Sequence, residues 1–192
     1  EVSMKTEPKT IGKKAFAYSG LKKITLSQKI TIIGESAFAY CPITSLVLTN
    51  NINSIGANAF EQSALTTITM PKALTEVPEN CFNGCSALKT IGLNTGVKTV
   101  GKNAFKGCSS LLNITIPANV ETISESAFED CTKLYNVIFN AGIKYIKPRA
   151  FANTTALTSV SFPYTLTELD GTSFEGSGLK NVTCYNKNVA SN

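Results

Sequence analysis

Apolar residues recur along the whole chain with a fixed period. Phenylalanines are spaced by 22 residues in the first part of the chain and by 23 residues in the rest. The series consists of Phe16, Phe38, Phe60, Phe82, Phe105, Phe128, Phe151 and Phe174. An aliphatic residue lies five positions before each phenylalanine, and a leucine or isoleucine follows five or six positions after it. Self-similarity at such a period is the sequence signature of a repeat protein.

Each repeat contains a short stretch in which apolar and polar residues alternate. Apolar residues come three and five positions after the leucine, as at Ile114 and Ile116. Alternation at period two, rich in β-branched residues, predicts a short strand with one buried face. Before each phenylalanine the apolar spacing changes to i, i+4, i+5 and i+8, as in residues 33–41. This second spacing predicts a short helical or 3-10 return segment.

A unit of 22 or 23 residues cannot bury its own apolar face, so successive units must stack and form columns of equivalent side chains. The sequence therefore predicts one α/β solenoid domain over residues 1–192, with eight repeats and a partial amino-terminal repeat. Val2 and Met4 occupy strand positions of that partial repeat, which gives about nine short strands. The truncated first unit and the lack of a polar cap predict a fragment of a longer protein, and a nonstandard capping strand is the alternative.

The segment Leu111–Cys131 reads Leu-x-x-Ile-x-Ile-Pro-x-x-Val-x-x-Ile-x-x-x-Ala-Phe-x-x-Cys. This unit resembles the BspA-like, or Treponema-type, leucine-rich repeat, and the resemblance extends over the whole chain. It implies a right-handed horseshoe or arc with a parallel sheet on its concave side. It also implies a large secreted or surface-anchored protein, extracellular or on the cell surface, that adheres to host matrix proteins or to other cells. The chain departs from the general pattern just beyond the strand, where the usual Asn or Cys ladder is replaced by mixed residues.

The composition disfavours most catalytic chemistry. The chain has no histidine, which removes the usual general base, Ser-His-Asp and Cys-His catalysis, and Cys₂His₂ zinc sites. The carboxylate pairs Glu76/Glu79, Glu121/Glu125 and Glu129/Asp130 fall on return segments, where we expect solvated faces, and not on opposed walls of a cleft. No apolar run reaches the roughly 18 residues of a membrane span. We predict a protein that is not an enzyme, has no cofactor or metal site and does not insert into a membrane.

Two small residue types also recur in columns. Cys41, Cys85, Cys108 and Cys131 share one column with serine and threonine, and stacked parallel side chains have poor geometry for a disulfide. We therefore interpret them as buried free thiols, with disulfides as the alternative in a secreted chain. Cys81 and Cys184 are interpreted as core substitutions. Glycines after the closing isoleucine, namely Gly12, Gly34, Gly56 and Gly101, are interpreted as turn residues.

The net charge of +5 comes almost wholly from lysine. Lysines cluster near the amino end and in two later sets. The clusters are Lys5, Lys9, Lys13, Lys14, Lys22, Lys23 and Lys29, then Lys98, Lys102 and Lys106, then Lys144, Lys147 and Arg149. Such clusters form solvated surfaces or bind polyanions. Nucleic-acid readers usually add arginine and aromatic residues, so we predict no nucleic-acid partner.

The outward positions of the predicted strands are the best candidate for recognition, because a solenoid presents them as one extended surface. The candidate residues are Lys23, Thr25, Ser45, Val47, Thr67, Thr69, Thr90, Asn113, Thr115, Asn136, Ile138, Ser159, Ser161, Asn181 and Thr183. The surface is rich in hydroxyl and amide groups and lacks anchor residues, so we expect weak contacts repeated along the array. The alternative is that threonine simply suits exposed strand positions.

Three sequons give candidate glycosylation sites at Asn113, Asn153 and Asn181. Glycans attached to the first and the last would obstruct the strand surface, and in an Asn- and Thr-rich chain the sequons can also be accidental.

Three functions are compatible with these observations. The first is a non-enzymatic interaction module at the cell surface or secreted, whose partner, by the resemblance, is a host extracellular-matrix or cell-surface protein. The second is an architectural spacer that carries another domain. The third is a lectin-like or polyanion-binding module that uses the lysine clusters. The sequence names no ligand.

Overall fold

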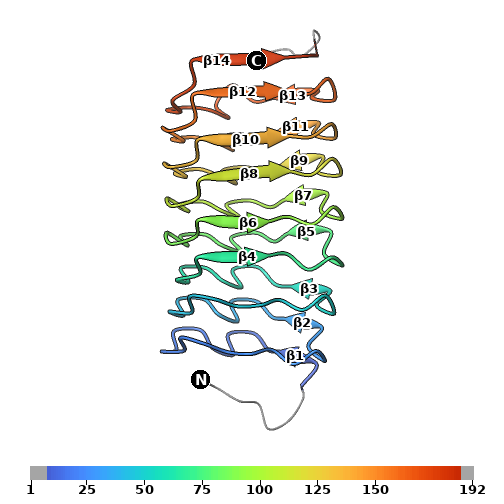
Figure 1. Cartoon of the computed structure of the whole chain (residues 1–192), viewed down its shortest axis with the longest axis vertical. Coiled ribbons are helices and arrows are strands. Elements are labelled where there is room, and N and C mark those ends of the chain that lie inside the picture. Colours follow the sequence, from blue (N-terminus) through green and yellow to red (C-terminus); the bar gives the residue numbers. More distant parts are fainter. Residues whose placement is uncertain (1–7, 187–192) are drawn as a thin grey trace.

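A computed structural model describes residues 8–186, whose backbone winds into a stack of coils (Figure 1). We number the coils 1 to 8 by their phenylalanine, from Phe16 in coil 1 to Phe174 in coil 8. Coil 1 contains β1, at the bottom of Figure 1, and coil 8 ends with β14, at the top. Each coil runs through a two-residue strand, a return segment that contains the phenylalanine, and then a longer strand or its equivalent. The predicted partial repeat at Val2 and Met4 lies outside the described residues.

The longer strands form the front row of the stack. They are β4 (Thr67–Thr69), β6 (Thr90–Gly92), β8 (Asn113–Ile116), β10 (Asn136–Phe139), β12 (Ser159–Phe162) and β14 (Asn181–Cys184). They pair in parallel as β4 with β6, β8 with β10, and β12 with β14. Equivalent residues of neighbouring repeats face one another, as Ile114 faces Val137. Coil 2 adds only an isolated bridge from Ser45 to Thr67.

The two-residue strands form a second row. They are β1 (Thr10–Ile11), β2 (Ile32–Ile33), β3 (Ser54–Ile55), β5 (Glu76–Val77), β7 (Thr99–Val100), β9 (Thr122–Ile123), β11 (Tyr145–Ile146) and β13 (Glu168–Leu169). They make one parallel sheet of three strands and another of five. The predicted parallel-strand solenoid is confirmed, but its single row of about nine strands must be corrected to two rows. The second row escaped the sequence analysis because two residues are too few to show an alternation.

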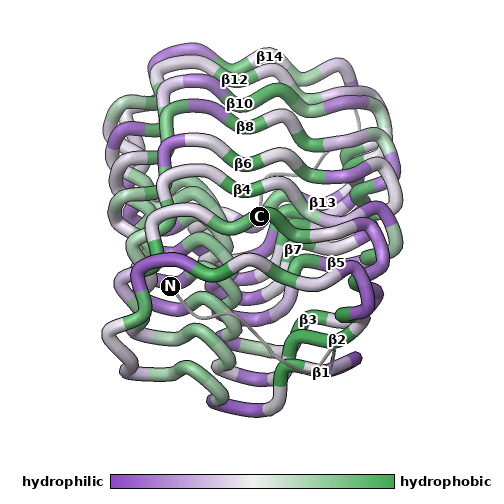
Figure 2. The backbone as a smooth tube through the Cα atoms, turned by 60° about the horizontal axis from the view of Figure 1, so that its bottom comes forward, coloured by the Kyte–Doolittle hydropathy of each residue, from purple (hydrophilic) through white to green (hydrophobic). Residues whose placement is uncertain are grey.

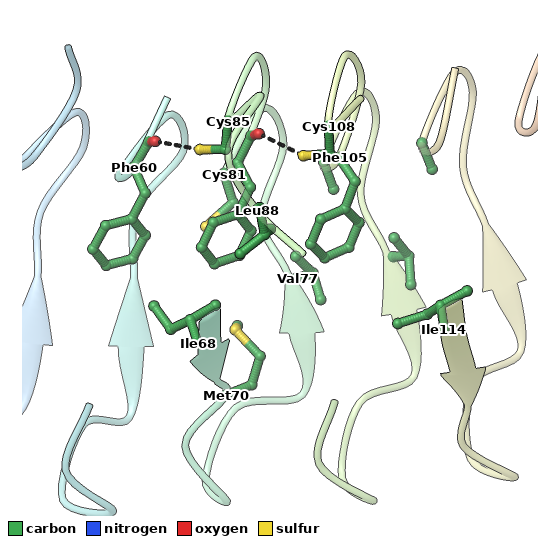
Figure 3. Packing of buried hydrophobic residues seen from close by; sticks show 14 of the residues in the cluster. Phe60, Ile68, Met70, Val77, Cys81, Cys85, Leu88, Phe105, Cys108 and Ile114 are labelled. Atoms are coloured by element: carbon green, nitrogen blue, oxygen red, sulfur yellow. Dashed lines mark hydrogen bonds between the residues drawn. The ribbon is translucent and has the colours of Figure 1, made fainter. Parts of the chain in front are cut away.

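The core of the stack is a column of phenylalanine rings. From Phe16 to Phe174, successive ring centroids lie 5.0–5.6 Å apart with interplanar angles of 3–16°. The rings from Phe38 to Phe151 are fully buried in this column, and the aliphatic columns pack around them in one continuous cluster (Figure 3). Hydrophobic segments recur at the same places in successive coils (Figure 2). The stacking of equivalent side chains that the period predicts is therefore confirmed.

The return segments are not helical, which corrects the prediction of helical or 3-10 segments. None of the described residues is in a helix. In coil 1 the N–H of Ala15 donates to Gly12 O within the coil (3.2 Å), whereas the N–H of Phe16 donates to Ala37 O of the next coil (2.8 Å). The same alternation continues through the other returns. An α-helix needs every N–H for its own i−4 carbonyl, and here every second N–H is used by the neighbouring coil.

Left-handed backbone conformations also prevent a helix in the returns. The first seven returns each have two such positions, and the return of coil 8 has one, Gly176. They lie two residues before and two residues after the phenylalanine, as at Asn58 (φ 57°) and Gln62 (φ 54°). The later column also contains Gly84, Gly107 and Asn153, residue types that tolerate this conformation. The apolar spacing gave no sign of these positions because their side chains are outside the core.

The glycines after the closing isoleucine begin the turns, as predicted, since the N–H of Ala37 donates to Gly34 O three residues before it. Gly34 and Gly56 also allow close contact between coils. Gly34 and Gly56 do not have positive φ angles. A Cβ added at Gly56 would lie 2.4 Å from the backbone N of Glu35, and one at Gly34 would lie 2.7 Å from the carbonyl carbon of Gly12. At Gly12 an added Cβ would meet nothing within 4 Å. Coils 1 to 3 therefore stack too closely at this position for a side chain on either Gly34 or Gly56.

Substitution of a central ring should cost far more stability than substitution of an outer ring. Phe105→Ala removes a fully buried ring that has a stacked ring on each side, and we expect the free energy of unfolding to fall by about 3–5 kcal/mol. Phe16→Ala removes a half-buried ring and should cost clearly less. Urea unfolding followed by circular dichroism measures both losses, and equal losses would contradict a continuous stacked core.

Glycine substitutions test the close approach of the coils. Gly56→Ala should lower the free energy of unfolding by about 2–3 kcal/mol, because the new methyl group overlaps the backbone of the preceding coil. Gly12→Ala is the matched control and should change stability by less than about 0.5 kcal/mol. Thermal unfolding of the two variants decides the matter. If Gly56→Ala proved as stable as Gly12→Ala, the glycine column would have no role in stacking.

Candidate interaction surface

The outward side chains of the front row form one continuous surface, which we call the strand face. The fifteen predicted residues are all exposed and lie in coils 1–8. In β4, β8, β10 and β12 the exposed residues alternate with buried ones, as in β8, where Asn113 and Thr115 are exposed and Ile114 and Ile116 are buried. The parallel register places equivalent residues side by side. The sequence therefore located this surface correctly, whereas its role in binding stays a prediction.

The strand face is mostly neutral and polar, with two apolar points. Thr90 Oγ1 donates a hydrogen bond to Thr67 Oγ1 across neighbouring coils (2.9 Å). Val47 is 82% exposed and Ile138 is 48% exposed. Most of the other members carry hydroxyl or amide groups that point to solvent. This chemistry suits a large number of weak contacts better than one tight anchor.

Three hollows interrupt the strand face. The first, about 250 Å³, is lined by Lys23, Ile24, Thr25, Leu26, Gln28, Ser45, Leu46, Val47 and Thr49. The second, about 650 Å³, is lined by Leu48, Asn50, Thr69, Met70, Lys72, Leu93, Asn94 and Thr95. The third, about 270 Å³, lies between β10 and β12 and includes Asn136, Ile138, Ser159 and Ser161. The first two hollows are neighbours, since the segment 47–50 contributes to both.

The first and third hollows occur where the front row loses its backbone pairing. Within the described part of the chain, no backbone hydrogen bond joins residues 23–26 to residues 45–48, and β10 does not pair with β12. The Oγ1 atom of Thr49, beside the first hollow, is buried and has no hydrogen-bond partner. An unsatisfied buried hydroxyl is rare because it costs about 1–3 kcal/mol.

The return side is crossed by ion pairs between neighbouring coils. The pairs are Lys13–Glu35 (2.8 Å), Lys102–Glu125 (3.0 Å), Lys106–Glu129 (3.0 Å), Lys144–Glu121 (3.1 Å), Lys147–Glu168 (2.7 Å), Arg149–Glu129 (2.6 Å) and Arg149–Glu175. The two later basic clusters are thus largely neutralised within the protein. Most of the pairs are exposed, so each adds little to stability.

Glu129 is an exception, and it corrects the prediction that the carboxylate pairs are all solvated. Glu76, Glu79, Glu121 and Glu125 are exposed, but Glu129 is only 6% exposed. Burial alone would raise the pKa of Glu129, but hydrogen bonds from Arg149, Ser126 and Lys106 outweigh it and lower the pKa to about 2. Glu129 is therefore a buried, ionised link between Arg149 and Lys106.

The cysteine column is confirmed as a ladder of buried free thiols. Cys85 Sγ donates to Phe60 O of the preceding coil (3.0 Å; Figure 3), and Cys108 and Cys131 repeat this contact at 3.2 Å. Burial raises the pKa of Cys85 to about 11, although a hydrogen bond with Ser63 lowers it. Burial also raises the pKa of Cys131. Such thiols are poor nucleophiles at neutral pH.

The two remaining cysteines differ in burial. Cys81 is fully buried, as predicted for a core substitution, whereas Cys184 is exposed, which corrects the same interpretation. Cys184 lies on β14, all four residues of which are exposed.

The three sequon asparagines differ in their surroundings. Asn113 and Asn181 are exposed on the strand face. Asn153 is half-buried, and its Nδ2 donates to Asp130 Oδ1 (2.8 Å). A glycan on Asn153 would have to break this bond, so Asn113 and Asn181 are the better candidate acceptors.

Three features of the surface were not predicted from the sequence: the Glu129 link, the hollows, and a stacked pair of exposed tyrosines. Tyr18 and Tyr40 stack with ring centroids 4.6 Å apart. The ion pairs could have been predicted from the sequence, since opposite charges recur about one repeat apart, as at Lys106 and Glu129. No sequence pattern could have predicted the hollows, because they depend on how neighbouring coils pack in three dimensions.

Within residues 8–186, no group of three His, Cys, Asp or Glu side chains is placed to hold a metal ion. Over the same residues, no helix has the length and apolar character needed to cross a membrane.

Comparisons with known proteins agree with the repeat. The family model of the BspA type leucine rich repeat region matches residues 9–135 and 88–191, with six copies. The chain is similar to a leucine-rich repeat protein from Eubacterium ventriosum, with 29% identity, a TM-score of 0.77, and coverage of 85% of this chain and 46% of that one. The chain thus spans less than half of that protein. No curated protein matches the chain.

Two further structures share the fold. The Treponema pallidum leucine-rich repeat protein has 24% identity and a TM-score of 0.68, over 77% of this chain and 71% of that one. The pneumococcal vaccine antigen PcpA has 22% identity and a TM-score of 0.52, over 90% of this chain and 55% of that one.

Glu129 should make stability depend on acid pH. Its pKa of about 2 lies below the ordinary value of 4.5, so the ionised group stabilises the fold above pH 4.5. This contribution, on the order of 3 kcal/mol, should be lost as the pH falls from about 4.5 to about 2. Urea unfolding at several pH values should show a flatter profile for Glu129→Gln than for the parent protein. Glu125→Gln, at an exposed ion pair, is the control and should retain the parent slope.

Proposed function

The chain belongs to the BspA-type leucine-rich repeat family, and from this premise we propose that it is a non-enzymatic adhesion module, extracellular or on the cell surface. Its partner is a protein of the host extracellular matrix or cell surface. The strand face makes the contact, through many weak interactions along the stack. Leucine-rich repeats generally mediate protein binding, and family membership supports this location.

The observation that carries the proposal is the difference between the two long surfaces of the stack. On the return side, charged side chains are tied to neighbouring coils, as Lys102 is to Glu125. On the strand face, Thr90 bonding to Thr67 is the one side-chain hydrogen bond among the fifteen described residues. Hydroxyl and amide groups there remain available for hydrogen bonds to a partner over the whole stack. Once one contact has formed, the next contacts form at a high effective concentration, so many weak contacts give a higher overall affinity.

Several features support a non-enzymatic role. The chain has no histidine, the thiols of the cysteine column are buried, and burial raises the pKa of Cys85 and Cys131. Glu129, whose pKa is lowered, is engaged by two cations. No acid, base and nucleophile converge among these groups, as catalysis would need.

A spacer that carries another domain is the second candidate, and the unbroken phenylalanine column favours it. Stacked rings from Phe16 to Phe174 and backbone bonds at every junction make a stiff rod. A spacer needs stiffness but no free strand face. The two candidates therefore differ in what substitution of that face should do.

Glutamate substitutions on the strand face should abolish adhesion if the first candidate holds. We expect the triple variant Thr115→Glu, Asn136→Glu and Ser161→Glu to lower binding to immobilised matrix proteins or host cells at least tenfold. The new carboxylates must be desolvated in the contact, and the displaced weak contacts lose their multivalent gain. Biolayer interferometry and cell-adhesion assays measure the change. Circular dichroism checks that the fold is retained.

The matched control places the same three charges on the other row of strands and its corner, as Thr10→Glu, Ser54→Glu and Thr75→Glu. These side chains are exposed and lie off the strand face. The control should bind as the parent protein does. Equal binding by both triple variants and the parent would exclude the strand face and leave the spacer.

A further inference from the structure

The first and second hollows lie in the amino-terminal part of the strand face, in the part of the stack that carries all the excess positive charge. We propose that these two hollows together form a binding site for a linear acidic glycan, whose carboxylate or sulfate groups are held by Lys23 and Lys72. The site is in coils 1–4. It is separate from the coils 5–7 that the adhesion experiment alters, so either proposal can fail alone.

The charge is distributed unevenly along the stack. Residues 8–75 contain seven lysines and two glutamates, whereas residues 76–186 contain nine basic and nine acidic residues. From residue 8 to residue 34 there are six lysines and no acidic residue. In the later coils much of the positive charge is paired, as in Lys106–Glu129 and Lys147–Glu168. The first coils therefore keep a positive field that attracts anions.

The linings of the two hollows contain cations and hydrogen-bonding groups but no carboxylate. Lys23, Thr25, Gln28 and Ser45 line the first hollow, and Lys72, Asn50, Asn94 and Thr95 are among the residues of the second. The polar groups that a ligand meets there are one lysine ammonium in each hollow and neutral hydroxyl and amide groups, set among apolar side chains such as Leu46 and Leu93. An anionic molecule rich in hydroxyl groups complements such a lining.

Thr49 gives a second, independent indication that the first hollow binds a polar group. Its side-chain oxygen is buried and has no partner in the protein, although the residue is 8% exposed and lines the hollow. The two segments that border this hollow, residues 23–26 and 45–48, also lack backbone hydrogen bonds to each other. A bound ligand with hydroxyl or acidic oxygen atoms would satisfy these groups.

The shape and lining favour a glycan chain over a nucleic acid. Because segment 47–50 borders both hollows, a linear polymer can occupy them in succession. Neither lining contains arginine or an aromatic residue, the side chains that single-strand readers use to stack bases. Threonine, serine, asparagine and glutamine instead match the hydroxyl groups of sugars.

The test compares the affinity of the full chain for three probes of similar length. A heparin-derived oligosaccharide supplies sulfate and carboxylate groups, a hyaluronan oligosaccharide supplies carboxylates only, and oligo(dT) supplies phosphates. Isothermal titration at about 50 and about 200 mM salt gives the affinity and its salt dependence. We expect at least one acidic glycan to bind, and to bind more tightly than oligo(dT). The comparison of the two glycans identifies the anionic group.

Variants locate the site. Lys23→Gln with Lys72→Gln should weaken glycan binding about tenfold and reduce the salt slope by about two. Lys133→Gln with Lys180→Gln removes the same charge at exposed positions outside the hollows and should change binding less than about twofold. Thr49→Val should weaken binding while raising the melting temperature, because it removes the unsatisfied hydroxyl without removing bulk. A purely structural role for Thr49 would not produce this opposite pair of effects.

Four results would overturn the proposal. They are no binding of either glycan at low salt, binding of oligo(dT) as tight as that of the glycans, equal weakening by the two lysine pairs, and unchanged glycan affinity in Thr49→Val. Loss of matrix adhesion in the coil 5–7 variant with glycan binding intact would leave this site standing, and the reverse result would leave the adhesion proposal standing.

Discussion

At each of the seven junctions between coils, the N–H of the phenylalanine donates to a carbonyl of the next coil, from Phe16 to Ala37 through to Phe151 to Ser173. The stacked rings shield these bonds from water, and a buried backbone group without a partner would be costly. The front row is different, because within residues 8–186 coils 1 and 2 lack backbone hydrogen bonds there and the strands do not pair between coils 4 and 5 or between coils 6 and 7. One bond, from the N–H of Leu112 to Lys89 O, remains between coils 4 and 5. The bonds of the return side therefore hold the stack together, and they also set the positions of the front-row segments.

This division of labour explains where interactions with other molecules are available. On the return side, backbone N–H groups and most charged side chains are bonded to neighbouring coils. The front row can lose backbone pairing locally without breaking the stack, and hollows open at two of these interruptions. Because the strand face is not needed everywhere for stacking, its side chains can differ from coil to coil. Such variation on a rigid scaffold suits recognition of a partner.

The core of the stack is uniform, but the chemistry of its surface is not. The ring spacing stays within 5.0–5.6 Å over the whole stack, while charge, hollows and ion pairs change from coil to coil. The first coils are cationic and open at the front, and the later coils are neutral and cross-linked by pairs such as Arg149–Glu129. One repeat can thus support surfaces of different chemistry in a single stack, which is what the proposed protein-binding face and the proposed anion site require.

The sequence by itself determined the columns, because a residue that recurs at every repeat must meet its own copies when the repeats stack. The phenylalanine core, the buried thiols of Cys85 and Cys108, and the exposure of Thr115 and its equivalents all follow from that periodicity. The tertiary structure decided what depends on contacts between different positions of neighbouring coils. Alternate N–H groups are drawn to the next coil, so the returns are not helices, and Glu129 is buried because two cations from adjacent coils converge on it. The hollows arose in the same way, since strand separation is set by packing and not by the order of residues along one repeat.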